Sequence, residues 1–366
     1  STAVIIPHLM LPKDWLSVAS LDVGIPGVPL SDVTGDECCM ACIGHCRVLV
    51  ICPCTSPESA DRLCVVVTLL EEAVSTALSG RGRGRRNGRE PGVESTGLLS
   101  VEQVPCPIPP GLTGLSMTRV GGKVYVYGGK PSHSPSSTLW VMDIETLHWT
   151  RREQQEEPAI PGNNTTTQDS IPWPSARTDH LSIRIGGRGR GRLVVVGGTG
   201  VEGRALMDMW QYEEEAGAWT ELPPSPIPLS SSAAHAVVHG TAHFISGSDH
   251  VTYSAEKGWQ RLRGLSYTLD HATAMDIGRY LVYMGGYGSD TTVSYYDSVT
   301  RSTRTVGDLT TENCLEYSRV CKVSPTLALV LAGGAEKGAM ILSFTRHQHK
   351  ERGCGRGGRR MCRGRR

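Results

Sequence analysis

Cysteine and histidine are the residues of this sequence most able to do chemistry, and seven of the twelve cysteines gather between positions 38 and 64. The stretch CCMACIGHC places Cys39 and Cys42 in a Cys-x-x-Cys pair, with a histidine and a further cysteine just after it. Such a pair is the usual half of a tetrahedral zinc site, which needs four ligands. No second pair follows at a matching interval. The sequence therefore favours buried cysteines that act as small hydrophobic side chains, with zinc binding and redox or disulfide use as the alternatives.

A second candidate for metal binding is a run of spaced histidines, His235, His239 and His243. Residues at odd positions of an unbroken strand share one face, so the three imidazoles would converge if the strand were continuous. Gly240 predicts a turn inside the run, and the turn would separate them. We therefore expect structural histidines here, and we expect the chain to hold no metal and no cofactor.

The motifs of the common catalytic classes do not occur in the sequence. There is no G-x-S-x-G nucleophile elbow, no H-E-x-x-H zinc motif, no P-loop and no dinucleotide fingerprint between a strand and a helix. We identify no catalytic residue, and the sequence favours a non-catalytic protein over an enzyme.

Arginine and glycine form three tracts, at 81–89, at 186–192 and in the tail 346–366. The tail carries nine Lys and Arg residues against one Glu, a net charge of +8 in a chain whose formal net charge is +1. Arginine contacts phosphates and stacks on bases while glycine keeps the backbone flexible, so we expect the tail to bind RNA, with a solvated linker as the alternative. The candidate RNA-binding residues are Arg356, Arg359, Arg360, Arg363, Arg365 and Arg366.

The elements that must position these residues are predicted to be strands. The chain has 366 residues with 43 Gly and 22 Pro, and it lacks sustained helical periodicity except over 64–78. That stretch, CVVVTLLEEAVSTAL, is the one helix candidate. No run of 18 apolar residues occurs, so we expect no membrane span and no membrane partner. One large all-β domain fits this composition best.

The strongest signal is an internal repeat of apolar alternating runs that end in two glycines. KVYVYGG, RLVVVGG, YLVYMGG and LALVLAGG follow one another at intervals of about 38 to 69 residues once a degenerate copy, AHFISG, is included. Glycine at the end of these runs predicts positive φ or close approach of another backbone. The repeated glycines are Gly128, Gly129, Gly197, Gly198, Gly285, Gly286, Gly333 and Gly334.

An acidic or tyrosine residue followed by tryptophan recurs after each glycine pair. MDIETLHW ends at Trp149, QYEEEAGAW at Trp219 and VTYSAEKGW at Trp259, whereas the next copy has threonine in the aromatic position. The acid predicts a tight turn between the third and fourth strands of a repeat, as at Asp143. The tryptophan is then expected to pack from the fourth strand.

Together these features resemble the kelch repeat, over about residues 111–345. The family also has an Arg-x-x-His-like element upstream, which matches Arg177 and His180 in PSARTDH and, more weakly, His235 and His271. The resemblance implies a β-propeller with four-stranded antiparallel blades. These four residues are candidates for binding at the central funnel or on one face, and structural hydrogen bonding at the blade starts is the alternative.

The termini are expected to close the ring together. The last repeat supplies three strands before the basic tail, and residues 13–30, with Trp15, resemble the fourth-strand segments elsewhere. We expect this N-terminal strand to complete the last blade. Residues 31–110 must then form a degenerate blade, with HCRVLVICPC as its second strand and DRLCVVVTLLEE as its third. This predicts six blades, with seven as the alternative count.

The sequence thus predicts one propeller over 1–345, of which 1–30 close the ring, followed by a basic flexible tail over 346–366. Fold does not determine function. We expect a protein-interaction scaffold that binds protein partners through its blade loops within a larger assembly, namely a ribonucleoprotein whose RNA the tail contacts. The alternative is an enzyme or binder that takes a small, sugar-like molecule in the central funnel. We expect an intracellular, reducing compartment, either the cytoplasm or an organelle such as the mitochondrion.

Overall fold

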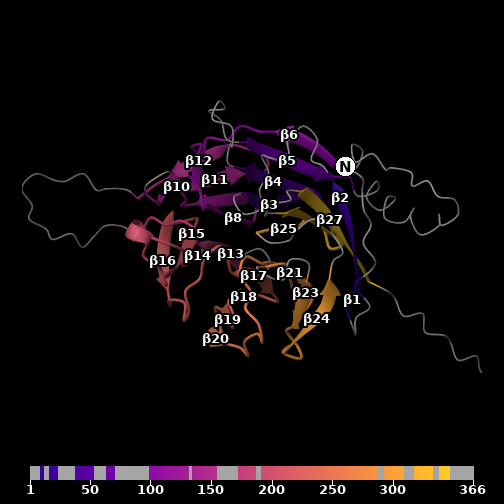
Figure 1. Cartoon of the computed structure of the whole chain (residues 1–366). Coiled ribbons are helices and arrows are strands. Elements are labelled where there is room, and N and C mark those ends of the chain that lie inside the picture. The colour runs from indigo at the N-terminus through magenta and orange to yellow at the C-terminus, as the bar shows by residue number, and fades with distance from the viewer. Residues whose placement is uncertain are drawn as a thin grey trace, which may run out of the picture.

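The computed structural model is a ring of six antiparallel sheets, each forming one blade (Figure 1). It describes residues 9–11, 16–23, 38–52, 63–70, 99–131, 134–154, 172–186, 191–286, 292–308, 317–332 and 338–346. The first blade is β3 (Cys39–Gly44), β4 (Arg47–Cys52), β5 (Leu63–Leu69) and β6 (Leu99–Gln103), and the second is β8 (Ser116–Val120), β9 (Lys123–Tyr127), β11 (Leu139–Asp143) and β12 (Trp149–Arg152).

The remaining blades follow in chain order. The third is β13 (Leu181–Ile185), β14 (Arg192–Val196), β15 (Met209–Glu213) and β16 (Ala218–Leu222), and the fourth is β17 (Ala234–Val238), β18 (Thr241–Ser246), β19 (Asp249–Ser254) and β20 (Gly258–Arg261). The fifth is β21 (Thr273–Ile277), β22 (Tyr280–Met284), β23 (Thr292–Asp297) and β24 (Ser302–Asp308), and the sixth is β25 (Arg319–Lys322), β26 (Leu327–Ala332) and β27 (Gly338–Arg346) with two N-terminal strands. A short ladder joins β7 (Leu112–Thr113) to β10 (Lys130–Pro131), and the 3₁₀ turn η3 spans Val201–Gly203.

Within a blade, strands that are consecutive in the chain pair with each other. In the third blade, for example, Val195 of β14 lies opposite Ser182 of β13 on one side and Trp210 of β15 on the other. The second strand is therefore flanked by two others, and its apolar run from Leu193 to Val196, with three β-branched valines, is buried. This arrangement explains why the second strands carry the most apolar sequence of each repeat.

The core lies between the blades rather than at one centre. Each of its six clusters of buried side chains is shared by two neighbouring blades. Val194 and Val196 of the third blade, for instance, belong to the same cluster as Phe244 and Val251 of the fourth. Every blade therefore depends on both of its neighbours for burial of its two faces.

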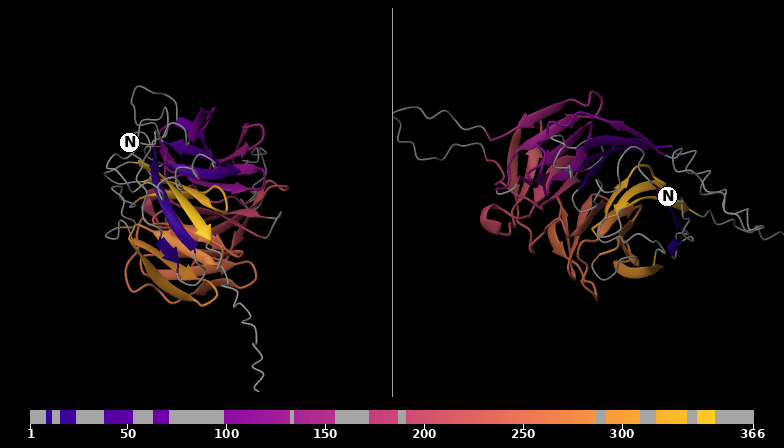
Figure 2. Two further views of the ribbon diagram at one scale, coloured as in Figure 1. Left: turned by 90° about the vertical axis from the view of Figure 1, so that its right-hand side faces the viewer. Right: turned by 45° about the horizontal axis from the view of Figure 1, so that its top comes forward.

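The N-terminal segment closes the ring, as the sequence predicted. Strand β2 (Leu16–Val23) pairs antiparallel with β27 along its whole length, from Leu16 opposite Arg346 to Val23 opposite Ala339. The short β1 (Leu9–Leu11) adds a further strand outside β2. Figure 2 shows the indigo N-terminal strand beside the yellow strand near the C-terminus. Trp15, which was expected to belong to this blade, falls outside the described residues.

The degenerate region between 31 and 110 supplies exactly one blade, so the ring has six blades and not seven. The predicted second and third strands are β4 and β5 of the first blade. The helix prediction for 64–78 is wrong over its described part, because Leu63–Leu69 is the strand β5. Its continuous apolar run reflects a strand buried on both faces, a pattern that a buried helix can share. No helix in the described part of the chain has the length and apolar character needed to cross a membrane.

The glycine pairs mark places where the next blade's entering segment crosses the end of the second strand. Gly128 and Gly129 have φ of 66° and 90°, and the Gly129 N–H donates to the Arg177 carbonyl oxygen at 2.9 Å. A Cβ on Gly128 would lie 2.5 Å from that oxygen. Gly197 and Gly198 repeat this geometry in the third blade, and Gly285 and Gly286 also have positive φ. Gly333 and Gly334 fall outside the described residues.

The acidic residue and the tryptophan of the repeat flank the turn of the outer hairpin, where Met142 pairs with Trp149. Asp143 Oδ1 accepts hydrogen bonds from the backbone N–H groups of Glu145 and Thr146, which forms the predicted turn. Trp219 is buried and packs against Tyr212 of its own blade. Trp149 and Trp259 are half-buried, and their indole N–H groups donate to the carbonyl oxygens of Pro105 and Pro223, which follow the last strand of the preceding blade.

Candidate functional site: the axial cavity

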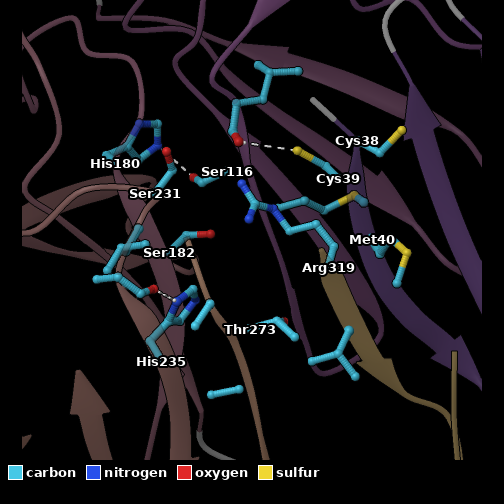
Figure 3. A pocket seen from close by; sticks show the side chains of 17 residues that line it. Cys38, Cys39, Met40, Ser116, His180, Ser182, Ser231, His235, Thr273 and Arg319 are labelled. Atoms are coloured by element: carbon cyan, nitrogen blue, oxygen red, sulfur yellow. Dashed lines mark hydrogen bonds between the residues drawn. The ribbon is translucent and has the colours of Figure 1, made fainter. Parts of the chain in front are cut away.

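A cavity of about 160 Å³ lies on the axis of the ring, where the first strands of all six blades meet (Figure 3). Each first strand contributes at least one polar or sulfur-bearing side chain to its wall. In blade order these side chains include Cys39, Ser116, Ser182, His235, Thr273 and Arg319. The ring itself therefore assembles the site from six separate positions in the sequence.

The cavity lies at one end of the axis. Its wall is formed by the beginnings of the first strands and by the residues just before them, such as Leu115 and His180. The start of a first strand lies beside the end of the second strand, as Leu181 pairs with Val196 in the third blade. The loops that join second to third strands therefore surround the same end of the ring as the cavity.

A hydrogen bond joins the second and third blades at the cavity wall. Ser116 Oγ lies 2.6 Å from His180 Nε2, and two residues further along these strands Thr118 Oγ1 lies 2.7 Å from Ser182 Oγ. Burial, together with the positive charge of Arg177, holds the pKa of His180 well below its usual value. The imidazole is therefore neutral at physiological pH.

A serine bonded to a neutral histidine resembles half of a nucleophilic triad, but the rest of the arrangement differs. In such triads a third group orients the histidine through its other ring nitrogen. His180 Nδ1 is buried with no hydrogen-bond partner among the described residues, and a Cβ on Gly128 would lie 3.4 Å from it. The pair accordingly serves as a bridge between two blades.

His235 is the second histidine on the cavity wall. Its Nδ1–H donates to the Ala233 carbonyl oxygen at 3.1 Å, which leaves Nε2 as a hydrogen-bond acceptor. Burial lowers the pKa of His235, and the charge of Arg319 acts in the same direction. This imidazole is also neutral, so it can accept a hydrogen bond from a ligand but carries no charge with which to attract one.

Arg319 is the one permanently charged side chain among the residues that line the cavity. It enters from β25, and Figure 3 shows it extending across the cavity between the serines and the cysteine side of the wall. Cys39 lies on that side and donates its S–H to the Leu115 carbonyl oxygen at 3.2 Å. The cavity thus presents hydroxyl groups, one acceptor nitrogen and one positive charge.

The four sequence candidates for the funnel are divided by the structure. His180 and His235 line the cavity, whereas Arg177 is buried away from its wall in a two-point ion pair with Asp208, at 2.9 and 2.6 Å. His271 packs against the Tyr317 ring with 4.1 Å between the ring centroids, and it is not part of the wall. This placement of Arg177 corresponds to the alternative given above, structural hydrogen bonding at the start of a blade.

The structure also places the two metal candidates. Cys39 and Cys42 donate their S–H groups to the carbonyl oxygens of Leu115 and Gly44, at 3.2 and 3.1 Å. His239 lies in the turn between β17 and β18 with φ of 50°. His243 faces the fifth blade, where its ring packs against Tyr296 and its Nδ1 lies 3.0 Å from His250 Nε2. The three spaced histidines therefore do not converge. In the part of the chain that the structure describes, no group of three or more His, Cys, Asp or Glu side chains could hold a metal ion.

Sequence reasoning missed most of the cavity wall, namely Cys39 in this role, Ser116, Ser182, Thr273 and Arg319. These residues share one property: each lies on the first strand of its blade. A comparison of the first strands of all repeats would have grouped them, but the glycine and tryptophan signals belong to the second and fourth strands. The tract at 81–89 and the arginines proposed to bind RNA lie outside the described residues.

Comparison with known proteins supports the repeat at two levels. Residues 111–152 match the Kelch motif family. A segment of 42 residues is 48% identical to Tip elongation aberrant protein 3 of Schizosaccharomyces pombe (strain 972 / ATCC 24843), which is 12% of this chain and only 4% of that protein. The solved structure of YjhT superimposes with a TM-score of 0.59 and 11% identity over 87% of this chain and 95% of that one, and it shows the fold alone. With a match to the Kelch motif in its second blade and six antiparallel blades in a ring, the chain is a six-bladed β-propeller that carries a kelch motif.

Proposed function

We propose that this propeller is a non-catalytic protein-interaction scaffold, whose partner contacts the loops around the axial cavity. The observation that carries the proposal is the hydrogen bonding of the cavity wall. The groups best suited to chemistry are already bonded to the protein itself, as in Ser116 with His180 and His235 with Ala233. A rigid wall of this kind favours recognition by the surrounding loops, which are the usual carriers of binding on rigid scaffolds.

The loop between β14 and β15 is the first part of this surface to test. It contains the turn η3, and Val201 within it is 59% exposed, one of three exposed large hydrophobic side chains among the described residues. Interaction with a partner would remove this side chain from water. Val201→Asp is expected to weaken partner retention at least tenfold in affinity purification from cell extract, with Val299→Asp, on the turn between β23 and β24, as the matched control.

We also propose that the partner assembly is a ribonucleoprotein and that the tail contacts its RNA. The support is the +8 net charge of residues 346–366 and their Gly/Arg composition. Replacement of the six candidate arginines by glutamine should abolish ultraviolet crosslinking of the intact chain to RNA. A variant with the same six positions changed to lysine keeps the charge and should retain part of it. Equal crosslinking in all three proteins would refute an RNA role for the tail.

A second candidate function is the binding of a small polar molecule in the axial cavity. The observation that favours it is the convergence of Arg319 with the hydroxyl groups of Ser182 and Thr273 in a cavity of about 160 Å³. Calorimetric titration with glucose and glucuronate is a matched test, because the two sugars differ in one carboxylate that Arg319 would bind. Binding of glucuronate that Arg319→Gln abolishes would favour this function over a scaffold.

The compartment is part of the same proposal. Most of the described cysteines are buried among apolar side chains, where they pack as small hydrophobic residues, and this supports an intracellular, reducing environment such as the cytoplasm or an organelle. Fractionation of cells that express the intact chain would test it, and recovery of the protein only from the medium would contradict it.

A further inference from the structure

Two cysteines face each other across the first hairpin of the first blade. Cys39 of β3 pairs with Ile51 of β4, so Cys38, one residue before, lies opposite Cys52, one residue after. Their sulfur atoms are in direct contact at 2.6 Å. Residues directly opposite in an antiparallel pair have Cα atoms about 4.5 to 5.5 Å apart, which lies within the range that a disulfide spans.

The surroundings of this pair are apolar, and one of the two residues borders the cavity. Cys38 is 1% exposed and Cys52 is fully buried, and both belong to the cluster shared by the first and sixth blades. Cys38 nevertheless forms part of the cavity wall, on the same side as Cys39 and Met40 (Figure 3). Because both sulfur atoms are buried, an oxidant that reaches them must be small, such as hydrogen peroxide.

We propose that Cys38 and Cys52 form a reversible disulfide in response to peroxide, a modification site in the wall of the axial cavity. The Cys38 thiolate attacks one peroxide oxygen, and the O–O bond breaks to give a sulfenic acid and hydroxide, which takes up the thiol proton as water. The Cys52 sulfur then attacks the sulfenic sulfur. An S–S bond forms, and the departing hydroxide leaves as a second water with the Cys52 proton.

This reaction balances without any group that the protein lacks. Each sulfur loses one electron and each thiol loses one proton, while hydrogen peroxide is reduced to two water molecules. A dithiol such as dithiothreitol reverses the reaction by exchange. The new bond would join the two innermost strands of the first blade next to the point where the ring closes, and it would fix the cysteine side of the cavity.

The position of Arg47 allows a direct test. It is the one Lys or Arg between the two cysteines, so trypsin separates Cys38, in peptide 14–47, from Cys52, in peptide 48–62. The intact chain is reduced, treated with peroxide, alkylated under denaturing conditions and digested. We expect the two peptides to be joined, with a mass lower by two hydrogens and with fragment ions that place the bond at Cys38 and Cys52, and we expect dithiothreitol to remove it.

Two variants make the result specific. Cys54→Ser changes another cysteine of the same tryptic peptide and should keep the bond, whereas Cys52→Ser should abolish it and leave oxidised Cys38. If Cys52→Ser does not fold, Cys52→Val, which suits the apolar site, provides the same test. Oxidation should also raise the melting temperature of Cys54→Ser by on the order of 5 °C, because the bond closes a 15-residue loop. Alkylation of both thiols after peroxide, or a bond to any other cysteine, would overturn the proposal, whatever the outcome for the scaffold.

Discussion

At the scale of single residues, the repeat tryptophans are not equivalent. Trp219 is 2% exposed and packs against Tyr127, Trp173 and Tyr212, whereas Trp149 is half-buried. We expect Trp219→Ala to cost about 3 to 5 kcal/mol of unfolding free energy, since it empties a buried aromatic site. Trp149→Ala should cost roughly half as much. Urea unfolding of both variants measures the difference, and equal losses would contradict the assigned packing.

The buried pair His243 and His250 predicts how stability responds to pH. Burial lowers their pKa values to about 4 and about 3, and the Tyr296 ring packs against both. Because both folded-state pKa values are depressed, the unfolded chain binds more protons below its pKa of about 6.5. Stability is therefore complete above pH 6.5 and falls as the pH drops toward 4, by roughly 2 kcal/mol per histidine between pH 6.5 and 5. His250→Gln should reduce that slope in urea unfolding, and an unchanged slope would refute the assignment.

How far single residues could be predicted depended on whether their role is local. The turn formed by Asp143 and the positive φ of Gly128 follow from short stretches of sequence, and both were predicted. Arg319 and Thr273 were not, because they reach the cavity only when the fifth and sixth blades close around the axis. Arg177 was identified from the family resemblance, but its buried ion pair with Asp208 requires the three-dimensional arrangement.

At the scale of elements, two costs of replacing a glycine can be told apart: the strain of a positive φ and the clash of an added Cβ with a neighbouring segment. Gly197 has φ of 68°, and a Cβ there would lie 2.2 Å from the Leu229 carbonyl oxygen. Gly121 has a similar φ of 61° with nothing within 4 Å of its added Cβ. Gly121→Ala should cost about 1 kcal/mol through backbone strain alone, and Gly197→Ala roughly 3 kcal/mol or more because the crossing segment must move. Thermal unfolding of the pair checks this, and similar melting temperatures would show that no segment crosses there.

The strands could be predicted where the repeat is clear, and their assignment was ambiguous where the repeat is degenerate. Over residues 111–345, the glycine pairs predicted the ends of the second strands and the tryptophans predicted the fourth strands. In the first blade the run from Cys64 resembled a helix as much as a strand, because a strand buried on both faces loses its alternation. Only pairing with β4 and β6 resolves the choice.

At the scale of the whole molecule, closure of the ring depends on strands from opposite ends of the chain. Strand β2 covers the edge of β27 along eight paired positions, so its removal exposes an unpaired edge on the sixth blade. A chain lacking residues 1–23 should melt at least 5 °C lower and self-associate through that edge. A synthetic peptide of residues 9–23 should restore the melting temperature in proportion to the logarithm of its concentration, because it binds only the folded ring. A scrambled peptide is the control. If the shortened chain stays monomeric with an unchanged melting temperature, closure by β2 contributes nothing to the stability of the propeller.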